Sequence, residues 1–154
     1  MKVRFAGLTD VGRKRNHNED RYLVQPEDHL YVVCDGMGGH ASGEVASQLA
    51  VDEIGEFFKL TRNEADVTWP YKPDKKLTEA ENRLAVGIRW ANFRVFDEAA
   101  TNPPLKGMGT TCVACHVVNG AQDTIAIAHV GDSRGYRIRG TEIEPMTEDH
   151  SLLN

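Results

Sequence analysis

The chain has 154 residues, of which 40% are hydrophobic and 27% are charged, and its formal net charge is −5 at neutral pH. This composition excludes a disordered tail or a coiled coil, and the length suits one domain or a large part of one. No apolar run approaches the roughly 20 residues that a membrane-spanning helix needs, and the excess of acid argues against a general nucleic-acid binder. The three cysteines give no disulfide framework and suit reduced thiols, so we expect a cytoplasmic protein.

The first half of the chain predicts strands followed by two helices. Residues Lys2–Leu8 mix apolar and basic side chains and predict a first strand, which a polar loop follows. Tyr22–Gln25 and His29–Cys34 are apolar or β-branched runs on either side of a Pro-Glu-Asp turn, which is typical of a hairpin. From Ala41 to Leu60, and again from Leu77 to Ala100, apolar residues recur at helical spacing.

The second half of the chain returns to strands. Thr111–Val118, Thr124–Val130 and Tyr136–Arg139 are rich in β-forming residues and are separated by glycine-containing turns. Strands, then a helix pair, then more strands favour an α+β fold, in which antiparallel sheet is covered by helices. Nothing before Asn154 closes the sheet, so we expect residues 1–154 to be the N-terminal portion of a single, truncated domain.

The sharpest chemical feature is the sequence Cys-Asp-Gly-Met-Gly-Gly-His at residues 34–40. A predicted strand delivers Asp35 to its end, and a glycine-rich turn then leads into a helix. A carboxylate at a strand end can face a cleft from a rigid backbone, and glycines such as Gly36 let main-chain atoms approach an ion or a phosphate. Taken alone, the stretch fits a simple strand-to-helix turn about equally well.

A second feature is the charged run from Arg15 to Asp20, with the sequence Arg-Asn-His-Asn-Glu-Asp. Arginine offers a fork of donors that matches phosphate oxygen atoms. Adjacent carboxylates favour hard cations such as Mg²⁺, Mn²⁺ or Ca²⁺. By itself, such a run is more often a solvated loop.

A third feature, Gly131–Arg134 (Gly-Asp-Ser-Arg), lies between two predicted strands. Alone it is most simply a hairpin turn, because glycine, aspartate and serine all suit one. Only together with the two earlier features, in this order along the chain, does it indicate a functional site.

In this order the features resemble the N-terminal part of the metal-dependent Ser/Thr protein phosphatases (type 2C, PPM) in their bacterial form. The matching segments run along essentially the whole chain: Asp10-Val11-Gly12, Arg15–Arg21, Asp35–His40, Gly109-Thr110-Thr111, Gly131–Arg134, and Thr147 with Asp149-His150-Ser151. The resemblance implies an αββα sandwich of two antiparallel sheets flanked by helix pairs. It also implies hydrolysis of phosphoserine and phosphothreonine in proteins by a water activated by a pair of metal ions.

The resemblance further implies roles for individual residues. Asp35 would bridge two Mn²⁺ or Mg²⁺ ions, and Gly36 would offer its carbonyl oxygen to one of them. Asp20 would act mainly through water on the metal, and Asp132 would contribute to a third, weaker ion position. Arg15 would hold the phosphate of the substrate.

Two departures from the family pattern affect these expectations. Eukaryotic members carry a histidine that serves as general acid directly after the Asp-Gly pair, whereas this chain has Met37 there, as bacterial members do. Protonation of the leaving group must therefore come from elsewhere or from water. His40 is a candidate for a substrate or proton role, although a place near the helix start is the simpler interpretation. The family also has two further metal-binding aspartates beyond the point that corresponds to Asn154, so we expect this chain to be a fragment of the catalytic domain.

A non-catalytic relative is the alternative interpretation: a phosphatase-like binding or regulatory module that kept the sandwich and lost part of its metal ligands. For the enzyme, we expect phosphorylated protein substrates, in opposition to a Ser/Thr kinase. We expect a monomer with no nucleic-acid or membrane partner.

Cys112 and Cys115 form a Cys-x-x-Cys sequence within a predicted strand. Positions i and i+3 of a strand point to opposite faces, so their thiols should not converge. We therefore expect neither a zinc site nor a redox site there.

Overall fold

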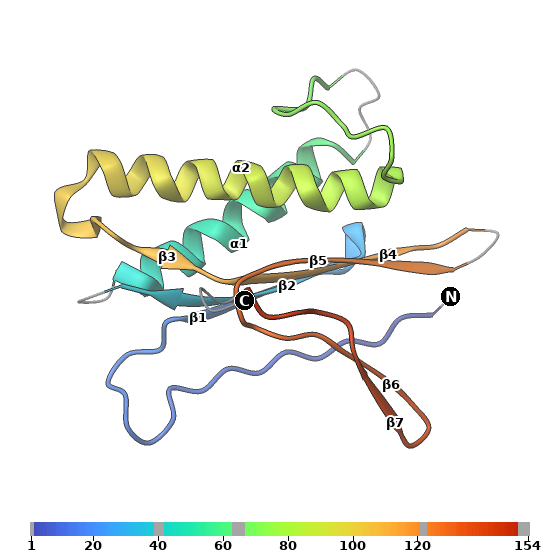
Figure 1. Cartoon of the computed structure of the whole chain (residues 1–154), viewed down its shortest axis with the longest axis horizontal. Coiled ribbons are helices and arrows are strands. Elements are labelled where there is room, and N and C mark those ends of the chain that lie inside the picture. The colour runs from blue at the N-terminus through green and yellow to red at the C-terminus, as the bar shows by residue number, and fades with distance from the viewer. Residues whose placement is uncertain (1, 39–41, 63–66, 121–122, 151–154) are drawn as a thin grey trace.

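The computed structural model describes residues 2–38, 42–62, 67–120 and 123–150 (Figure 1). Within these ranges the chain forms two α-helices, seven β-strands and two short 3-10 helices. In chain order the elements are β1 (Asp20–Gln25), η1 (Pro26–Asp28), β2 (Leu30–Met37), α1 (Ser42–Leu60), α2 (Glu79–Thr101), η2 (Pro103–Leu105), β3 (Gly109–Thr110), β4 (Cys112–Val118), β5 (Thr124–Val130), β6 (Tyr136–Arg139) and β7 (Glu142–Pro145).

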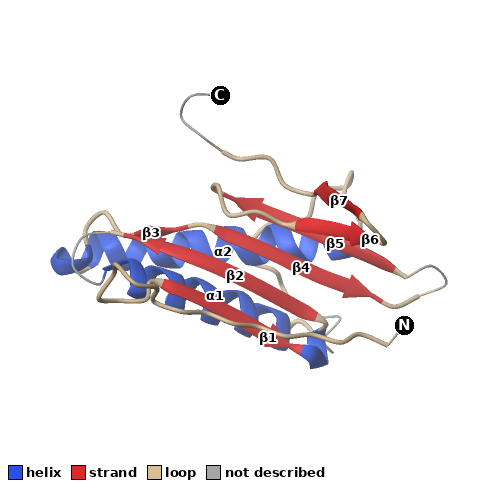
Figure 2. Ribbon diagram, turned by 90° about the horizontal axis from the view of Figure 1, so that it is seen from below, coloured by secondary structure: helices blue, strands red, loops and turns tan. Residues whose placement is uncertain are grey.

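The described strands form two antiparallel sheets. The larger sheet has the order β1-β2-β4-β5, and the short β3 pairs with the end of β2. Both α-helices cover one face of this sheet, whereas the β6–β7 hairpin and the extended N-terminal segment lie on the other side (Figures 1 and 2). The described residues thus form one helix pair, a five-stranded sheet and a two-stranded second sheet.

The core lies between the helix pair and the large sheet. Strand β2 alternates buried and exposed residues, so that Leu30, Val32 and Cys34 all point toward the helices. Ile54 and Phe58 of α1 and other apolar residues of the helix pair meet them there. This alternation fixes the register of β2, and it therefore decides which side chains at the C-terminal end of β2 face away from the helices.

The second helix begins and ends where the sequence directs it. The Thr78 side chain accepts a hydrogen bond from the Glu81 main chain, and the Glu81 carboxylate accepts one from the Thr78 main chain at 2.7 Å. This capping box satisfies main-chain donors that a helix start leaves free. Pro103, which cannot donate a main-chain hydrogen bond, follows the end of the helix at Thr101.

Most of the elements expected from the sequence are confirmed. The hairpin, both helices, the three later strands and the α+β class with antiparallel sheets are all present. Strands β3 and β7 were not expected, because β3 has just two residues and β7 alternates two glutamates with its apolar residues. None of the helices in the described part of the chain is long and apolar enough to cross a membrane.

The expected first strand over residues 2–8 is wrong. This segment has no strand pairing with any described residue. It lies instead on the face of the large sheet opposite the helices, the open face (Figure 2). There the Phe5 and Tyr31 ring centroids are 5.8 Å apart, and Gly7 packs against Tyr22. Its apolar residues are therefore used for contact with a sheet face and not for an edge-to-edge pairing.

Candidate metal and phosphate site

A cleft of about 620 Å³ opens where four segments of the chain meet. The loop before β1, the end of β2, the residue between β3 and β4, and the turn after β5 all contribute to its walls. Its lining residues are Arg15, Asn16, His17, Glu19, Asp35, Gly36, Met37, Gly38, Thr111 and Asp132. All three sequence features singled out above thus contribute to one concave surface.

Two acidic side chains lie opposite each other at one end of the β1–β2 hairpin. The antiparallel register pairs Asp20 with Asp35 directly. The pKa of Asp35 is raised, first by loss of hydration and then by the negative charges of Asp20 and Asp132, while the charge of Arg15 opposes the rise. The cleft therefore concentrates more negative charge around Asp35 than its single arginine offsets.

Arg15 is held in the cleft by Glu19. Its guanidinium donates to the Glu19 carboxylate at 3.2 Å, and its side chain is 67% exposed. The main chain of Glu19 is fixed from two sides, because its carbonyl oxygen accepts the Ser47 hydroxyl at 2.6 Å and the Gly36 amide at 3.1 Å. The loop is thus anchored on both α1 and β2, and the exposed arginine head is placed where an anion can enter.

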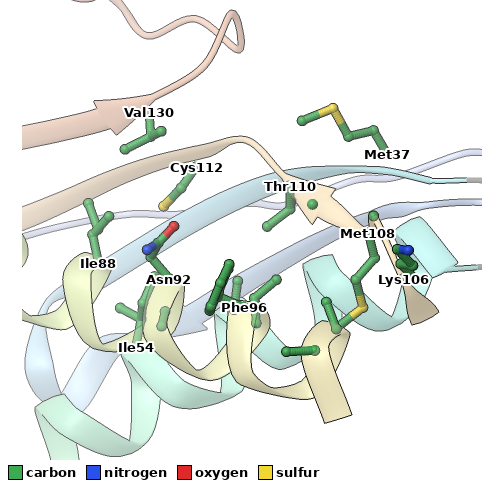
Figure 3. A pocket seen from close by; sticks show the side chains of 17 residues that line it. Met37, Ile54, Ile88, Asn92, Phe96, Lys106, Met108, Thr110, Cys112 and Val130 are labelled. Atoms are coloured by element: carbon green, nitrogen blue, oxygen red, sulfur yellow. The ribbon is translucent and has the colours of Figure 1, made fainter. Parts of the chain in front are cut away.

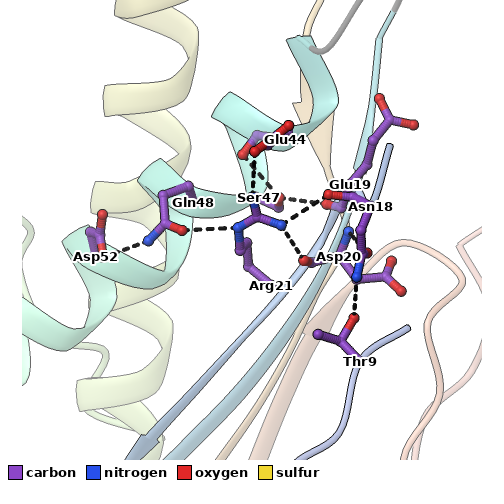
Figure 4. A network of polar contacts seen from close by, with 9 residues as sticks. All are labelled: Thr9, Asn18, Glu19, Asp20, Arg21, Glu44, Ser47, Gln48 and Asp52. Carbon is purple, nitrogen blue, oxygen red and sulfur yellow. Dashed lines mark hydrogen bonds and ion pairs between the residues drawn. The ribbon is translucent and has the colours of Figure 1, made fainter. Parts of the chain in front are cut away.

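Arg21 ties the same loop to helix α1 (Figure 4). Its guanidinium donates to the main-chain oxygens of Asn18 at 2.9 Å and Asp20 at 2.7 Å. It also donates to the Glu44 carboxylate at 2.6 Å and to Gln48 at 2.9 Å. The planar fork of arginine suits this simultaneous contact with several oxygen atoms. Arg21 therefore sets the position of Asp20 relative to α1.

The polar atoms around Asp35 fit part of a hard-cation site. Carboxylate and carbonyl oxygens are the ligands that Mg²⁺ and Mn²⁺ take, and Asp35, Asp132 and the Gly36 carbonyl group offer such oxygens beside the cleft. The mutual repulsion of the acids is a cost that a bound cation relieves. Nevertheless, within the described ranges no three or more His, Cys, Asp or Glu side chains are grouped so that they could hold a metal ion. The donor set is suitable in kind and incomplete in number.

Comparison with known proteins decides the family. The sequence profile described as "Protein phosphatase 2C" matches residues 11–151. The chain belongs to the protein phosphatase 2C family.

Relatives and solved structures within the family agree with this assignment. The serine/threonine phosphatase stp of Listeria innocua is 39% identical over 149 residues, which are 95% of this chain and 54% of the relative. The crystal structure of Stp1 from Staphylococcus aureus has a TM-score of 0.75 at 40% identity. The match covers 95% of this chain and 53% of the Stp1 chain. The catalytic domain of the phosphatase PstP, solved with two manganese ions, has a TM-score of 0.72 at 32% identity, with 94% of this chain covering 54% of that one.

This chain spans about half the length of these protein phosphatase 2C relatives. Arg15, Asp35, Gly36 and Asp132 are brought to one cleft. Asp20 lies beside Asp35 but lines a neighbouring cavity of about 450 Å³ on the open face of the sheet. His40, the other candidate, lies outside the described residues.

A third cavity, which is apolar and has a volume of about 460 Å³, lies between α2 and strands β3 and β4 (Figure 3). Lys106 is the one charged residue among its described lining residues, and Met37 lines both this cavity and the acidic cleft. Cys112 faces this cavity, whereas Cys115 lines the cavity on the open side of the sheet. The expectation that the Cys-x-x-Cys thiols point to opposite faces is confirmed.

Three residues that support the cleft have roles that the sequence alone does not indicate. Glu19 holds Arg15, Arg21 holds the loop, and Thr111 contacts the main chain of Asp35. All three lie within sequence segments that carry the family resemblance. Their roles depend on partners in other segments, so no local spacing could have indicated them.

Proposed function

We propose that this chain is the N-terminal part of a catalytic domain that hydrolyses phosphoserine and phosphothreonine in proteins, with Mn²⁺ or Mg²⁺ as cofactor. The observation that carries the proposal is the meeting of Arg15, Asp35 and Asp132 in one cleft, from three distant segments. The names of the relatives as serine/threonine phosphatases, and the two manganese ions of the PstP structure, support it.

Each residue has a proposed task in this reaction. Asp35, the Gly36 carbonyl group and, less directly, Asp20 would hold two ions, and Asp132 would serve a third. When bound, such ions make a water nucleophilic near neutral pH and neutralise phosphoryl oxygens. Arg15 would exchange its contact with Glu19 for the non-reacting oxygens of the phosphate, since its guanidinium is exposed and its fork of donors matches phosphate oxygens.

The substrates would be phosphoproteins made by an opposing Ser/Thr kinase. The cytoplasm is the proposed compartment, since Cys34, Cys112 and Cys115 are all free thiols, as a reducing environment favours. That the protein acts as a monomer is part of the same proposal.

The test compares the full-length protein with its Asp35→Asn variant on a phosphothreonine peptide over a Mn²⁺ titration. The variant should lose more than about 100-fold in kcat/KM, since even outer-shell partners of metal sites contribute about 10- to 100-fold. Asp97→Asn, at an exposed position on α2, is the matched control and should keep full activity. Equal activity of the Asp35→Asn variant and the parent protein would overturn the proposal.

The alternative is a phosphatase-like binding module with incomplete metal ligation. One observation favours it: the described ranges hold no ready group of three or more metal-binding side chains. Calorimetric titration of Mn²⁺ into the full-length protein separates the two functions. Binding that depends on Asp35 supports the enzyme, and its absence supports the module.

A further inference from the structure

Thr111 lies between β3 and β4 and holds the main chain of Asp35 on both sides. The Asp35 amide donates to the Thr111 hydroxyl at 3.0 Å, and the Thr111 amide donates to the Asp35 carbonyl oxygen at 2.9 Å. Thr111 is buried, so water does not readily replace these hydrogen bonds. The end of β2 that carries the Asp35 carboxylate is therefore fixed to Thr111.

The same threonine side chain also contacts both neighbours of Asp132. Its hydroxyl is 2.6 Å from the Ser133 hydroxyl. Its methyl group packs on Gly131, where an added Cβ would lie 2.7 Å from the Thr111 methyl carbon. Gly131 has a φ of +98°, a conformation that glycine adopts without strain. The turn that carries Asp132 is thus seated on Thr111 by one polar contact and one apolar contact.

Thr111 therefore connects two acidic side chains that repel each other. Groups that bind metal ions keep their geometry through hydrogen bonds behind them, and losing such a partner typically weakens metal binding. Thr111 hydrogen bonds both to the main chain of Asp35 and to Ser133 in the 131–133 turn. The threonine hydroxyl is the point through which the two segments are joined.

We propose that Thr111 is a positioning residue that fixes the separation of Asp35 and Asp132, with Ser133 as the far end of the link. The inference rests on the proposed function, because it concerns how the acids of that site are held. It assigns no contact of Thr111 with substrate or ion.

The two contacts of Thr111 can be removed separately. Thr111→Val keeps the shape and the methyl contact with Gly131 but removes the hydroxyl. Thr111→Ser keeps the hydroxyl and removes the methyl group. Ser133→Ala removes the other end of the link at a partly exposed position, and Thr124→Val, at the exposed start of β5, is the matched control.

The experiment titrates Mn²⁺ alone into the full-length protein and follows free Mn²⁺ by electron paramagnetic resonance. Thr111→Val and Ser133→Ala should each weaken binding by about 10-fold, as for other outer-shell partners. Because Thr111→Val already removes the contact with Ser133, the double variant should bind no more weakly than Thr111→Val alone. Thr111→Ser and Thr124→Val should bind like the parent protein. Rescue by serine separates positioning by the hydroxyl from a general loss of packing.

Two results distinguish this inference from the proposed function. If the parent protein shows no Mn²⁺ binding that depends on Asp35, the proposed function is overturned, and the inference with it. Parent protein that binds Mn²⁺, with Thr111→Val and Ser133→Ala binding equally well, or with additive losses in the double variant, overturns the inference alone. If Thr111→Val does not fold, Ser133→Ala decides between the same results.

Discussion

A Cβ atom placed on Gly36 would lie 1.9 Å from the carbonyl oxygen of Gly43. A Cβ atom on Gly43 would lie 2.8 Å from the Gly36 carbonyl carbon and from the Met37 amide nitrogen. The first turn of α1 therefore packs main chain against main chain on the end of β2. This contact leaves no room for a side chain on either glycine, and it places the start of α1 directly against Gly36 at the end of β2.

Replacement of Gly43 by alanine should separate the helix from the strand. The nearest atom to the new Cβ is a carboxylate oxygen of Glu19 at 2.5 Å, which can rotate aside, but the next two atoms belong to the backbone of β2 at 2.8 Å and cannot. Gly43→Ala should therefore lower the free energy of unfolding by about 1–3 kcal/mol, as overpacking does. Urea unfolding measures it. Gly135→Ala is the control, because its new Cβ would meet its neighbours at an ordinary 3.6 Å. Equal stability of the two variants would contradict the packing described above.

The Gly36–Gly43 pair also shows which features could be predicted from the sequence and which could not. Gly36 stood out because it follows an acid at a strand end, which is a local pattern. Gly43 looked like any residue in a helix, since its requirement comes from a backbone that lies seven positions earlier and folds back on it. The helices and the hairpin were predictable for the same local reason: periodicity and turn residues decide them.

Elements that depend on distant partners were predicted poorly. The segment over residues 2–8 has a strand-like pattern, but no described strand pairs with its edge. Its apolar side chains pack on the face of the large sheet instead. The meeting of Arg15, Asp35 and Asp132 could be expected only from the family resemblance, because nothing local in the sequence says which loops share a cleft. The links through Arg21 and Thr111 required the structure itself.

Replacement of Arg21 by lysine should loosen the loop that carries Asp20. A lysine ammonium cannot reach the Asn18 and Asp20 carbonyl oxygens and the Glu44 carboxylate together. We expect Arg21→Lys to lower the free energy of unfolding by about 1–3 kcal/mol, the scale for a lost hydrogen bond to a charged group. It should also weaken Mn²⁺ binding.

Arg139→Lys, on the exposed strand β6, is the matched control for urea unfolding and Mn²⁺ titration. It should change neither measurement. An Arg21→Lys protein with the stability and the Mn²⁺ affinity of the parent would show that the remaining contacts suffice to hold the loop.

The negative charge of Asp35 should cost stability when no cation is present. Asp20 and Asp132 both repel its carboxylate, and Arg15 only partly compensates. In EDTA at neutral pH, Asp35→Asn should therefore raise the melting temperature of the full-length protein, whereas Asp97→Asn should not. Addition of Mn²⁺ at about 100 times its dissociation constant should stabilise the parent by about 2.7 kcal/mol and the Asp35→Asn variant by much less. A metal-free variant that melts below the parent would contradict the repulsion.

A buried ion pair far from the cleft should control stability toward acid. The side chain of Asp28 is fully buried and accepts from the Arg62 guanidinium at 2.7 and 2.6 Å. Burial alone would raise the pKa of Asp28, but hydrogen bonds from Arg62 and Gln25 and the charges of Arg62 and Arg83 outweigh it, so the pKa lies below its usual value. A carboxyl group with a lowered pKa in the folded state stabilises the fold at pH values above its unfolded pKa.

This stabilisation is lost as the pH falls through the folded pKa of Asp28, because the protonated acid no longer pairs with Arg62. In Arg62→Gln the burial of Asp28 is no longer offset by that charge, so the variant should be less stable than the parent at pH 7. The difference should shrink as the pH falls below the usual pKa of aspartate. Burial, and then the charge of nearby Arg83, lower the pKa of His116 on β4. These effects favour its neutral form, so His116 does not replace the lost cation near neutral pH. Urea unfolding of both proteins between pH 3 and pH 8, in steps of about one unit, measures the difference, and a gap that stays constant over this range would show that the pair does not set the acid response.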